Sequence, residues 1–296
     1  MPSNTVIWSG AATSVYSTAG NWQANGPPVA TDEVILPDGN TVAITGSDEN
    51  ATALLSFTSK PGYSGAIGTL TAGLPVPLQL AATTYNLGGS GTAYIDLTAN
   101  STTTCNVTKA AAGSPSTGVY GLTLSSADTI ANLNINLATG GESVGVAALA
   151  GQTGTFTNVS IDGKGTVVLG AALATITDLK IAGEGTVYID CSYTTLTISG
   201  SPTVYQRAGA GTTLLCYGGR FYNNTTGTIT TTNIFPGATV DLTDGPQARV
   251  MTNTNVYGDG VFDDSDKRLA TCTLKVYGSG INVKLGANYT VTRTAI

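Results

Sequence analysis

The chain contains no histidine, and only 10% of its 296 residues are charged. The absence of histidine excludes metal sites built on imidazole, Ser-His-Asp and Cys-His catalysis, and the usual proton shuttle at neutral pH. An average soluble domain has roughly 25% charged residues. The surface must therefore be covered mainly by uncharged polar residues, and the abundant β-branched threonines suit exposed strand positions.

Basic residues are few and scattered. There are 12 of them in a chain of net charge −6, and Lys267-Arg268 is the only adjacent pair. Nucleic-acid binding needs a clustered basic face, so no nucleic-acid partner is expected.

The four cysteines form no Cys-x-x-Cys motif, which argues against a zinc site. They are Cys105, Cys191, Cys216 and Cys272. Cys191 and Cys216 could stack on neighbouring coils and form a disulfide, but buried free thiols are the favoured interpretation.

Long apolar runs are also missing, and we expect no secretion signal. No stretch approaches the roughly 18 apolar residues of a membrane span, so no membrane partner is expected. The segment that starts at Met1-Pro2-Ser3 has no basic region followed by an apolar region. We therefore expect synthesis in a host cytoplasm without a signal peptide; removal of a signal is the competing explanation.

The strongest positive feature is an internal repeat. Residues 159–169 align with residues 179–189, and residues 256–261 align with residues 276–281 at the same offset. Each copy has alternating apolar residues, a Gly-x-Gly turn and further alternating apolar residues. A period near 20 without a helical pattern is typical of stacked β-coils. The sequence therefore predicts an all-β fold, a parallel β-helix (β-solenoid) with coils of about 20 residues.

Stacking of such coils predicts where the core lies. Every second side chain of a strand points inward, and the next coil lies about 4.8 Å away. Gly163 and Gly183 are expected in turns that need a positive φ or close backbone approach. The predicted core residues are Val159, Ile161, Leu169, Leu179, Ile181 and Ile189.

Residues 1–45 differ from the rest because they contain both tryptophans, Trp8 and Trp22. The terminal coil of a solenoid exposes its core and an unpaired strand edge, which an atypical segment must cover. Large indole rings are suitable plugs, although two tryptophans could instead form a sugar-stacking platform. We expect an N-terminal cap or attachment segment at residues 1–45 and the β-solenoid at residues 46–296.

The positions of the acidic residues do not identify a pair of catalytic carboxylates. Glycoside hydrolysis needs two carboxylates about 5 to 9.5 Å apart, yet in the best repeat Asp162 aligns with Ala182 and Asp178 aligns with Asn158. Residues 259–266 contain four aspartates that could bind calcium, but their spacing matches no known calcium loop. A solvated turn is the favoured interpretation, and we expect no metal and no cofactor.

Tyrosines are common, with 13 Tyr against 5 Phe. Tyr188 falls in a column that should point outward. A lateral tyrosine-rich face is either an interface with a partner or another copy, or an ordinary surface of strand-preferring residues. The candidate interface residues are Tyr188, Tyr193, Tyr205, Tyr217 and Tyr222.

The opening segment carries a family resemblance through Trp8-Ser9-Gly10, Gly20-Asn21-Trp22, Pro28 and Asp32. It resembles the start of β-solenoid proteins found on bacterial surfaces and among phage structural proteins. The resemblance covers roughly the first 40 residues, and the later coils resemble the single-stranded β-helix class in their pattern. No catalytic motif of pectate lyases or tailspike glycosidases matches residue by residue.

The resemblance implies a non-enzymatic structural protein of the virion, of the capsid decoration or head-fibre type. It would decorate or stabilise the surface of a bacteriophage capsid, with the major capsid protein or other virion proteins as partners. A homotrimer is expected by analogy with phage β-helices. The alternatives are a carbohydrate-binding or carbohydrate-cleaving tailspike and a bacterial surface adhesin whose signal was removed.

Overall fold

The computed structural model describes residues 4–23, 26–46, 49–72, 74–245, 249–278, 282–285 and 290–294. These residues contain no α-helix and form a parallel β-solenoid whose coils are about 21 residues apart. The prediction of an all-β solenoid is confirmed. Part of the second repeat, residues 279–281, lies outside the described residues.

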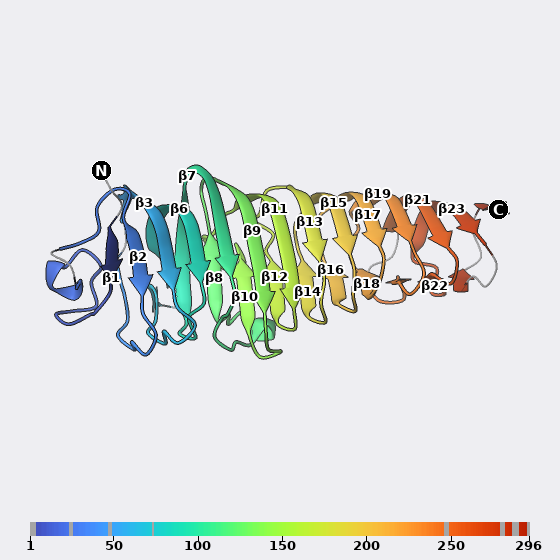
Figure 1. Ribbon diagram of the computed structural model, residues 1–296. Helices are drawn as coiled ribbons and strands as arrows, with labels where there is room; N and C mark the ends of the chain where they lie inside the picture. Colours follow the sequence, from blue (N-terminus) through green and yellow to red (C-terminus); the bar gives the residue numbers. More distant parts are fainter. Residues whose placement is uncertain are drawn as a thin grey trace. The chain divides into compact units, whose positions relative to one another are not determined.

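The chain divides into two compact units, Met1–Thr157 and Asn158–Ile296. Figure 1 labels most of the strands of the two units, which are described separately below. Strand β2 pairs in parallel with β3, so residues before position 45 take part in the same ladder as those that follow.

The first unit contains ten strands and two short 3-10 turns within the described residues. They are β1 (Thr5–Ile7), η1 (Ala19–Asn21), β2 (Glu33–Leu36), β3 (Glu49–Ser59), β4 (Thr69–Thr71), β5 (Leu74–Val76), β6 (Leu78–Leu87), β7 (Ala93–Val107), η2 (Pro115–Thr117), β8 (Leu122–Ser125), β9 (Thr129–Leu137) and β10 (Ser143–Val146). Among these strands only β4 and β5 pair antiparallel, as a hairpin that projects from one coil.

Parallel pairing in the first unit stacks large apolar side chains. Val34 of β2 lies opposite Phe57 of β3, and Phe57 lies opposite Tyr85 of β6. Tyr85 in turn lies opposite Cys105 of β7. All four side chains are buried, so the column forms the core of this unit.

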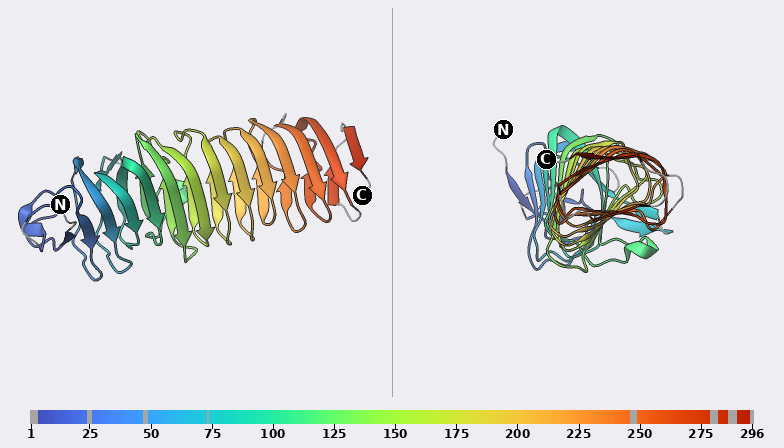
Figure 2. Two further views of the ribbon diagram at one scale, coloured as in Figure 1. Left: turned by 45° about the horizontal axis from the view of Figure 1, so that its top comes forward. Right: turned by 90° about the vertical axis from the view of Figure 1, so that its right-hand side faces the viewer.

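The second unit alternates two sets of strands, and each strand pairs with the next but one. After β11 (Thr155–Gly163), which begins at the end of the first unit, the strands are β12 (Thr166–Leu169), β13 (Ile176–Ile181), β14 (Thr186–Ile189), β15 (Tyr193–Ile198), β16 (Thr203–Gln206), β17 (Gly211–Cys216), β18 (Arg220–Asn223), β19 (Thr228–Ile234), β20 (Thr239–Asp241), β21 (Arg249–Tyr257), β22 (Val261–Asp264), β23 (Leu269–Tyr277), β24 (Asn282–Leu285) and β25 (Thr290–Thr294). Figure 2 shows the coils of this unit, coloured yellow to red, from two further sides.

The register in the second unit places the repeat residues on top of one another. Val159 pairs with Leu179 and Ile161 pairs with Ile181, while Leu169 pairs with Ile189. All six of these side chains are buried. Their column continues past the repeat, since Ile181 pairs with Ile198 and Ile198 with Cys216.

The coil length is not constant, because the loops between strands differ. Leu179 pairs with Leu196, which is a shorter step along the chain than the one from Val159 to Leu179. In the first unit the step from Phe57 to its partner Tyr85 is longer than either, since the β4–β5 hairpin lies between them. A search for a fixed period in the sequence therefore detects only those coils whose loops have the same length.

Glycine is required at two kinds of position. Gly163 and Gly183 have φ values of 97° and 80°, which side chains with a Cβ adopt at a cost. At Gly211 the constraint is space instead, because a Cβ there would lie 2.4 Å from Cε2 of the buried Tyr193.

Shortening one buried side chain of the core should destabilise the fold. Ile181→Ala removes buried methylene groups between Ile161 and Ile198, and we expect the free energy of unfolding to fall by about 2–5 kcal/mol. The adjacent Lys180→Ala removes an exposed side chain and should change it by less than about 0.5 kcal/mol. Chemical denaturation followed by circular dichroism measures both; equal effects would contradict the inward orientation of Ile181.

A methyl group at Gly211 should also destabilise the second unit. Gly211→Ala forces Tyr193 or the backbone to move, and overpacking of this kind costs about 1–3 kcal/mol. Gly141→Ala is the matched control, because its Cβ would meet no atom within 4 Å. The midpoint of thermal unfolding should fall for the first variant only.

Candidate functional site

Three tyrosines form an outward-facing stack on the second unit. Tyr188 of β14 pairs with Tyr205 of β16, and Tyr205 pairs with Tyr222 of β18. Their strand neighbours Val187, Val204 and Phe221 are buried, so alternation along each strand turns the tyrosines outward. We call Tyr188, Tyr205 and Tyr222 the tyrosine ladder.

The rings of the tyrosine ladder lie almost parallel to one another. Ring centroids of Tyr188 and Tyr205 are 5.2 Å apart with an interplanar angle of 15°, and those of Tyr205 and Tyr222 are 4.6 Å apart with an angle of 8°. Burial in the stack raises the pKa of Tyr205, with a smaller contribution from Tyr222. Tyr205 therefore presents a neutral hydroxyl at physiological pH, able to donate and to accept.

Two arginines flank the ladder and are held by aspartates. The guanidinium carbon of Arg207 lies 4.6 Å from the ring centroid of Tyr188, and that of Arg220 lies 5.0 Å from Tyr222. Arg207 donates to both carboxylate oxygens of Asp190, at 2.8 and 2.6 Å. Arg220 donates to Asp241 at 2.8 Å. Tyrosine and arginine are among the residue types enriched at the positions that contribute most to binding energy at protein interfaces.

Tyr193 does not belong to this face, contrary to the sequence-based prediction. Its side chain is only 1% exposed. The hydroxyl donates to Oε1 of Gln206 at 3.0 Å, and Gln206 donates to the carbonyl of Gly209. The reason is position: Tyr193 begins β15 on an inward-pointing site, and Gly211 on the next coil leaves room for its ring.

Tyr217 lies on the surface but in a second stack. Its ring centroid is 4.3 Å from that of Phe235, which is followed by Tyr257 at 5.0 Å and Tyr277 at a further 4.7 Å. Sequence reasoning missed Phe235, Tyr257 and Tyr277 as members of a face. The signal was present, because each of the four aromatic residues follows the last inward-pointing apolar or cysteine residue of its strand.

The two tryptophans are buried and touch each other edge to face, with centroids 5.0 Å apart. Trp22 donates its indole N–H to the carbonyl of Tyr16 at 2.8 Å. The chain around Trp22 returns antiparallel along the outer side of Trp8, and the amide of Gln23 donates to the carbonyl of Ile7. This return pairs with the chain at the end of β1, and buried rings cannot act as a sugar-stacking platform.

Two aspartates that the repeat alignment did not bring together do lie opposite each other. Asp241 of β20 pairs with Asp263 of β22. Asp241 accepts from Arg220 and Thr243, and Asp263 accepts from Lys284 at 2.8 Å and from Ser265. Burial would raise the pKa of Asp263, but the hydrogen bonds from Lys284 and Ser265 outweigh it and lower that pKa. A general acid needs the opposite shift.

The acidic segment 259–266 is partly strand rather than a solvated turn. β22 runs through it, with Asp263 pointing outward and Asp264 inward. Asp264 is fully buried and accepts hydrogen bonds from the backbone amides of Arg268 and Leu269; burial raises its pKa. Among the described residues, no group of three or more His, Cys, Asp or Glu side chains could hold a metal ion.

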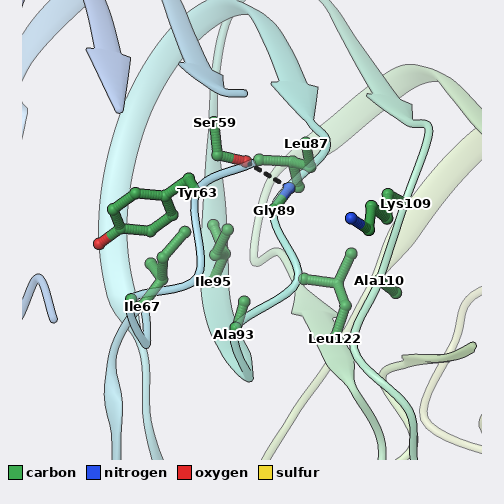
Figure 3. Close-up of a pocket in the computed structure, with 12 residues that line it drawn as sticks. Ser59, Tyr63, Ile67, Leu87, Gly89, Ala93, Ile95, Lys109, Ala110 and Leu122 are labelled. Atoms are coloured by element: carbon green, nitrogen blue, oxygen red, sulfur yellow. Dashed lines mark hydrogen bonds between the residues drawn. The ribbon is translucent and has the colours of Figure 1, made fainter. Parts of the chain in front are cut away.

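A small cavity lies inside the first unit beside Tyr63, Leu87 and Leu122 (Figure 3). Its volume is about 10 Å³, which is at the lower limit for a single water molecule. Ser59 closes one side by accepting from the amide of Gly89 at 3.3 Å. The cavity is a packing defect and cannot hold a ligand.

All four cysteines are free thiols. Cys191 and Cys216 do not stack on each other, since Cys216 pairs with Ile198 and Ile234. Burial raises the pKa of both thiols to about 12 and also raises those of Cys105 and Cys272.

Comparison with protein families, curated proteins and solved structures found no match to this chain. The part of the chain that the structure describes has no helix long and apolar enough to cross a membrane.

The thiols should differ in reactivity towards a disulfide reagent. Thiolate is the reactive form, so at pH 8 Cys105, Cys191 and Cys216 should not react in the folded chain. Cys272 is only partly buried and should react first. Titration with Ellman's reagent should detect at most one thiol per native chain and four after denaturation; two or more fast native thiols would contradict the burial.

Proposed function

We propose that the chain is a non-enzymatic structural protein of a virus particle, most specifically a decoration or head-fibre protein on a bacteriophage capsid. The β-solenoid serves as a rigid support that holds a binding face in a fixed geometry. The major capsid protein or another virion protein is the proposed partner, and the proposed location is the capsid surface.

The observation that carries this proposal is the tyrosine ladder with its flanking arginines. Tyr205 has a ring on each side, so its faces are used within the molecule and only ring edges and hydroxyls remain outward. A sugar ring binds an aromatic side chain through the aromatic face. A protein surface, in contrast, can use edges, hydroxyls and guanidinium groups.

Rigidity supports the same role. Each coil of the second unit is held to the next by parallel backbone hydrogen bonds, and stacking fixes the side chains before a partner arrives. Binding then loses little side-chain entropy, which favours affinity. We further propose that the assembly is a homotrimer, by analogy with phage β-helices.

The proposed location on the capsid surface can be tested directly on virus particles obtained from the organism in which the chain is found. We expect mass spectrometry of purified particles to detect the chain, and immunogold labelling to place it on the outer shell. Particles stripped of the chain should rebind it in a sedimentation assay, and mass photometry should measure three copies per soluble assembly.

The ladder can be tested by substitution in the same sedimentation assay. Tyr205→Ser should weaken rebinding at least tenfold, because a central interface tyrosine contributes about 2 kcal/mol or more. Tyr217→Ser, in the second aromatic stack, is the matched control and should have little effect.

Two results would overturn the proposed function. One is absence of the chain from purified particles. The other is turnover of a surface oligosaccharide by the purified chain, abolished by Asp241→Asn, which would favour the tailspike alternative.

A further inference from the structure

The net negative charge of the protein comes entirely from the first unit. Residues 1–157 contain two lysines, no arginine and eight Asp or Glu residues, which accounts for the whole net charge of −6. Residues 158–296 contain ten residues of each sign and are neutral overall. A basic partner would therefore be attracted to the first unit in particular.

A cleft of about 550 Å³ lies on the outside of this acidic unit. One wall comes from the β4–β5 hairpin and the residues after it, with Leu74, Pro75 and Pro77. Leu74 is 55% exposed, so its side chain is accessible to a ligand in the cleft. The loop at residues 150–152 forms another part of the lining.

The floor of the cleft is a row of polar side chains on three successive coils. Gln79 of β6 pairs with Asp96 of β7, and Asp96 pairs with Ser125 of β8. Gln79 donates to Oδ2 of Asp96 at 3.0 Å, and Ser125 donates to Oδ1 at 3.2 Å. The two neighbours fix the plane of the carboxylate from opposite sides.

Asp96 keeps the capacity for a cationic ligand. A carboxylate has about four acceptor sites, and the two neighbours occupy one on each oxygen. Both oxygens can accept another hydrogen bond, the arrangement that a planar guanidinium group matches with two parallel donors. Within the described residues Asp96 forms no ion pair, unlike Asp178, Asp190, Asp241 and Asp263, which each have a lysine or arginine.

The walls suit the rest of an arginine side chain. Leucine and proline side chains can cover its three methylene groups while the head remains polar. The lining contains no aromatic residue, so a sugar ring would find no stacking surface. The lining also includes Gln152, whose amide nitrogen is buried and has no hydrogen-bond partner among the described residues.

We propose that the cleft at Asp96 binds an arginine side chain from a basic segment of a partner protein. Asp96 accepts the guanidinium group, Gln79 and Ser125 position the carboxylate, and the hairpin covers the aliphatic part. The site is separate from the tyrosine ladder and does not depend on a role in a virus particle.

The test uses the full chain labelled with ¹⁵N and two small probes, N-acetyl-arginine methylamide and its uncharged counterpart N-acetyl-citrulline methylamide. We expect the arginine probe to shift the amide resonances of Gln79, Asp96 and Ser125, with an affinity at least tenfold above that of the citrulline probe. Raising the salt concentration should weaken binding, because charge attraction contributes to it.

Asp96→Asn should reduce the affinity for the arginine probe at least tenfold. Asp38→Asn is the matched control: it removes the same charge from an exposed position of the same unit and keeps an oxygen to accept from Gly62. Equal affinity for both probes, or unchanged binding in Asp96→Asn, would overturn the proposal. The two-probe comparison on the unsubstituted chain decides the matter even if Asp96→Asn does not fold. Stronger shifts at these amides from maltose than from the arginine probe would assign the cleft to carbohydrate instead.

Discussion

Parallel backbone pairing between successive coils is the constraint on which the rest of the structure depends. Pairing in register puts each residue against the equivalent residue of the next coil at the spacing of one strand, about 4.8 Å. The equivalent residues of successive coils form a column, and the column to which a residue belongs determines whether its side chain points inward or outward. Inward columns carry Val, Ile, Leu and Phe, as in the run from Ile161 through Ile181 and Ile198, and outward columns carry Thr, Tyr and Asn.

Because a column places similar side chains next to one another, it determines which contacts they form on the outer and inner faces of the sheet. Outward asparagines donate to one another, as Asn106 does to Asn86 and Asn134 does to Asn106. Outward tyrosines stack ring on ring and hold arginines beside them. An inward polar residue must instead find a partner inside, as Gln206 does with Tyr193. The buried Tyr193 is a core residue, whereas the tyrosines of the ladder are surface residues.

The two units use the shared architecture differently. Longer loops in the first unit form the β4–β5 hairpin and the cleft beside Asp96, and this unit holds the net negative charge. Shorter loops in the second unit leave its flank open, so the aromatic stacks form continuous surfaces. We interpret the first unit as the place for a charged contact and the tyrosine ladder of the second unit as the place for a larger protein contact.

The sequence by itself determined the fold class and a large part of the core, because alternating apolar residues that recur at a constant offset can be buried together only in stacked coils. It could not determine the lengths of the other coils, such as the shorter one from Leu179 to Leu196. The loops can vary in length while the pairing of the strands is kept. It also could not decide which tyrosines are exposed: Tyr193 and Tyr205 look alike until the register turns one inward and the other outward. Only the tertiary structure brought Gln79, Asp96 and Ser125 together, because each lies on a different coil and the intervening loops have unequal lengths.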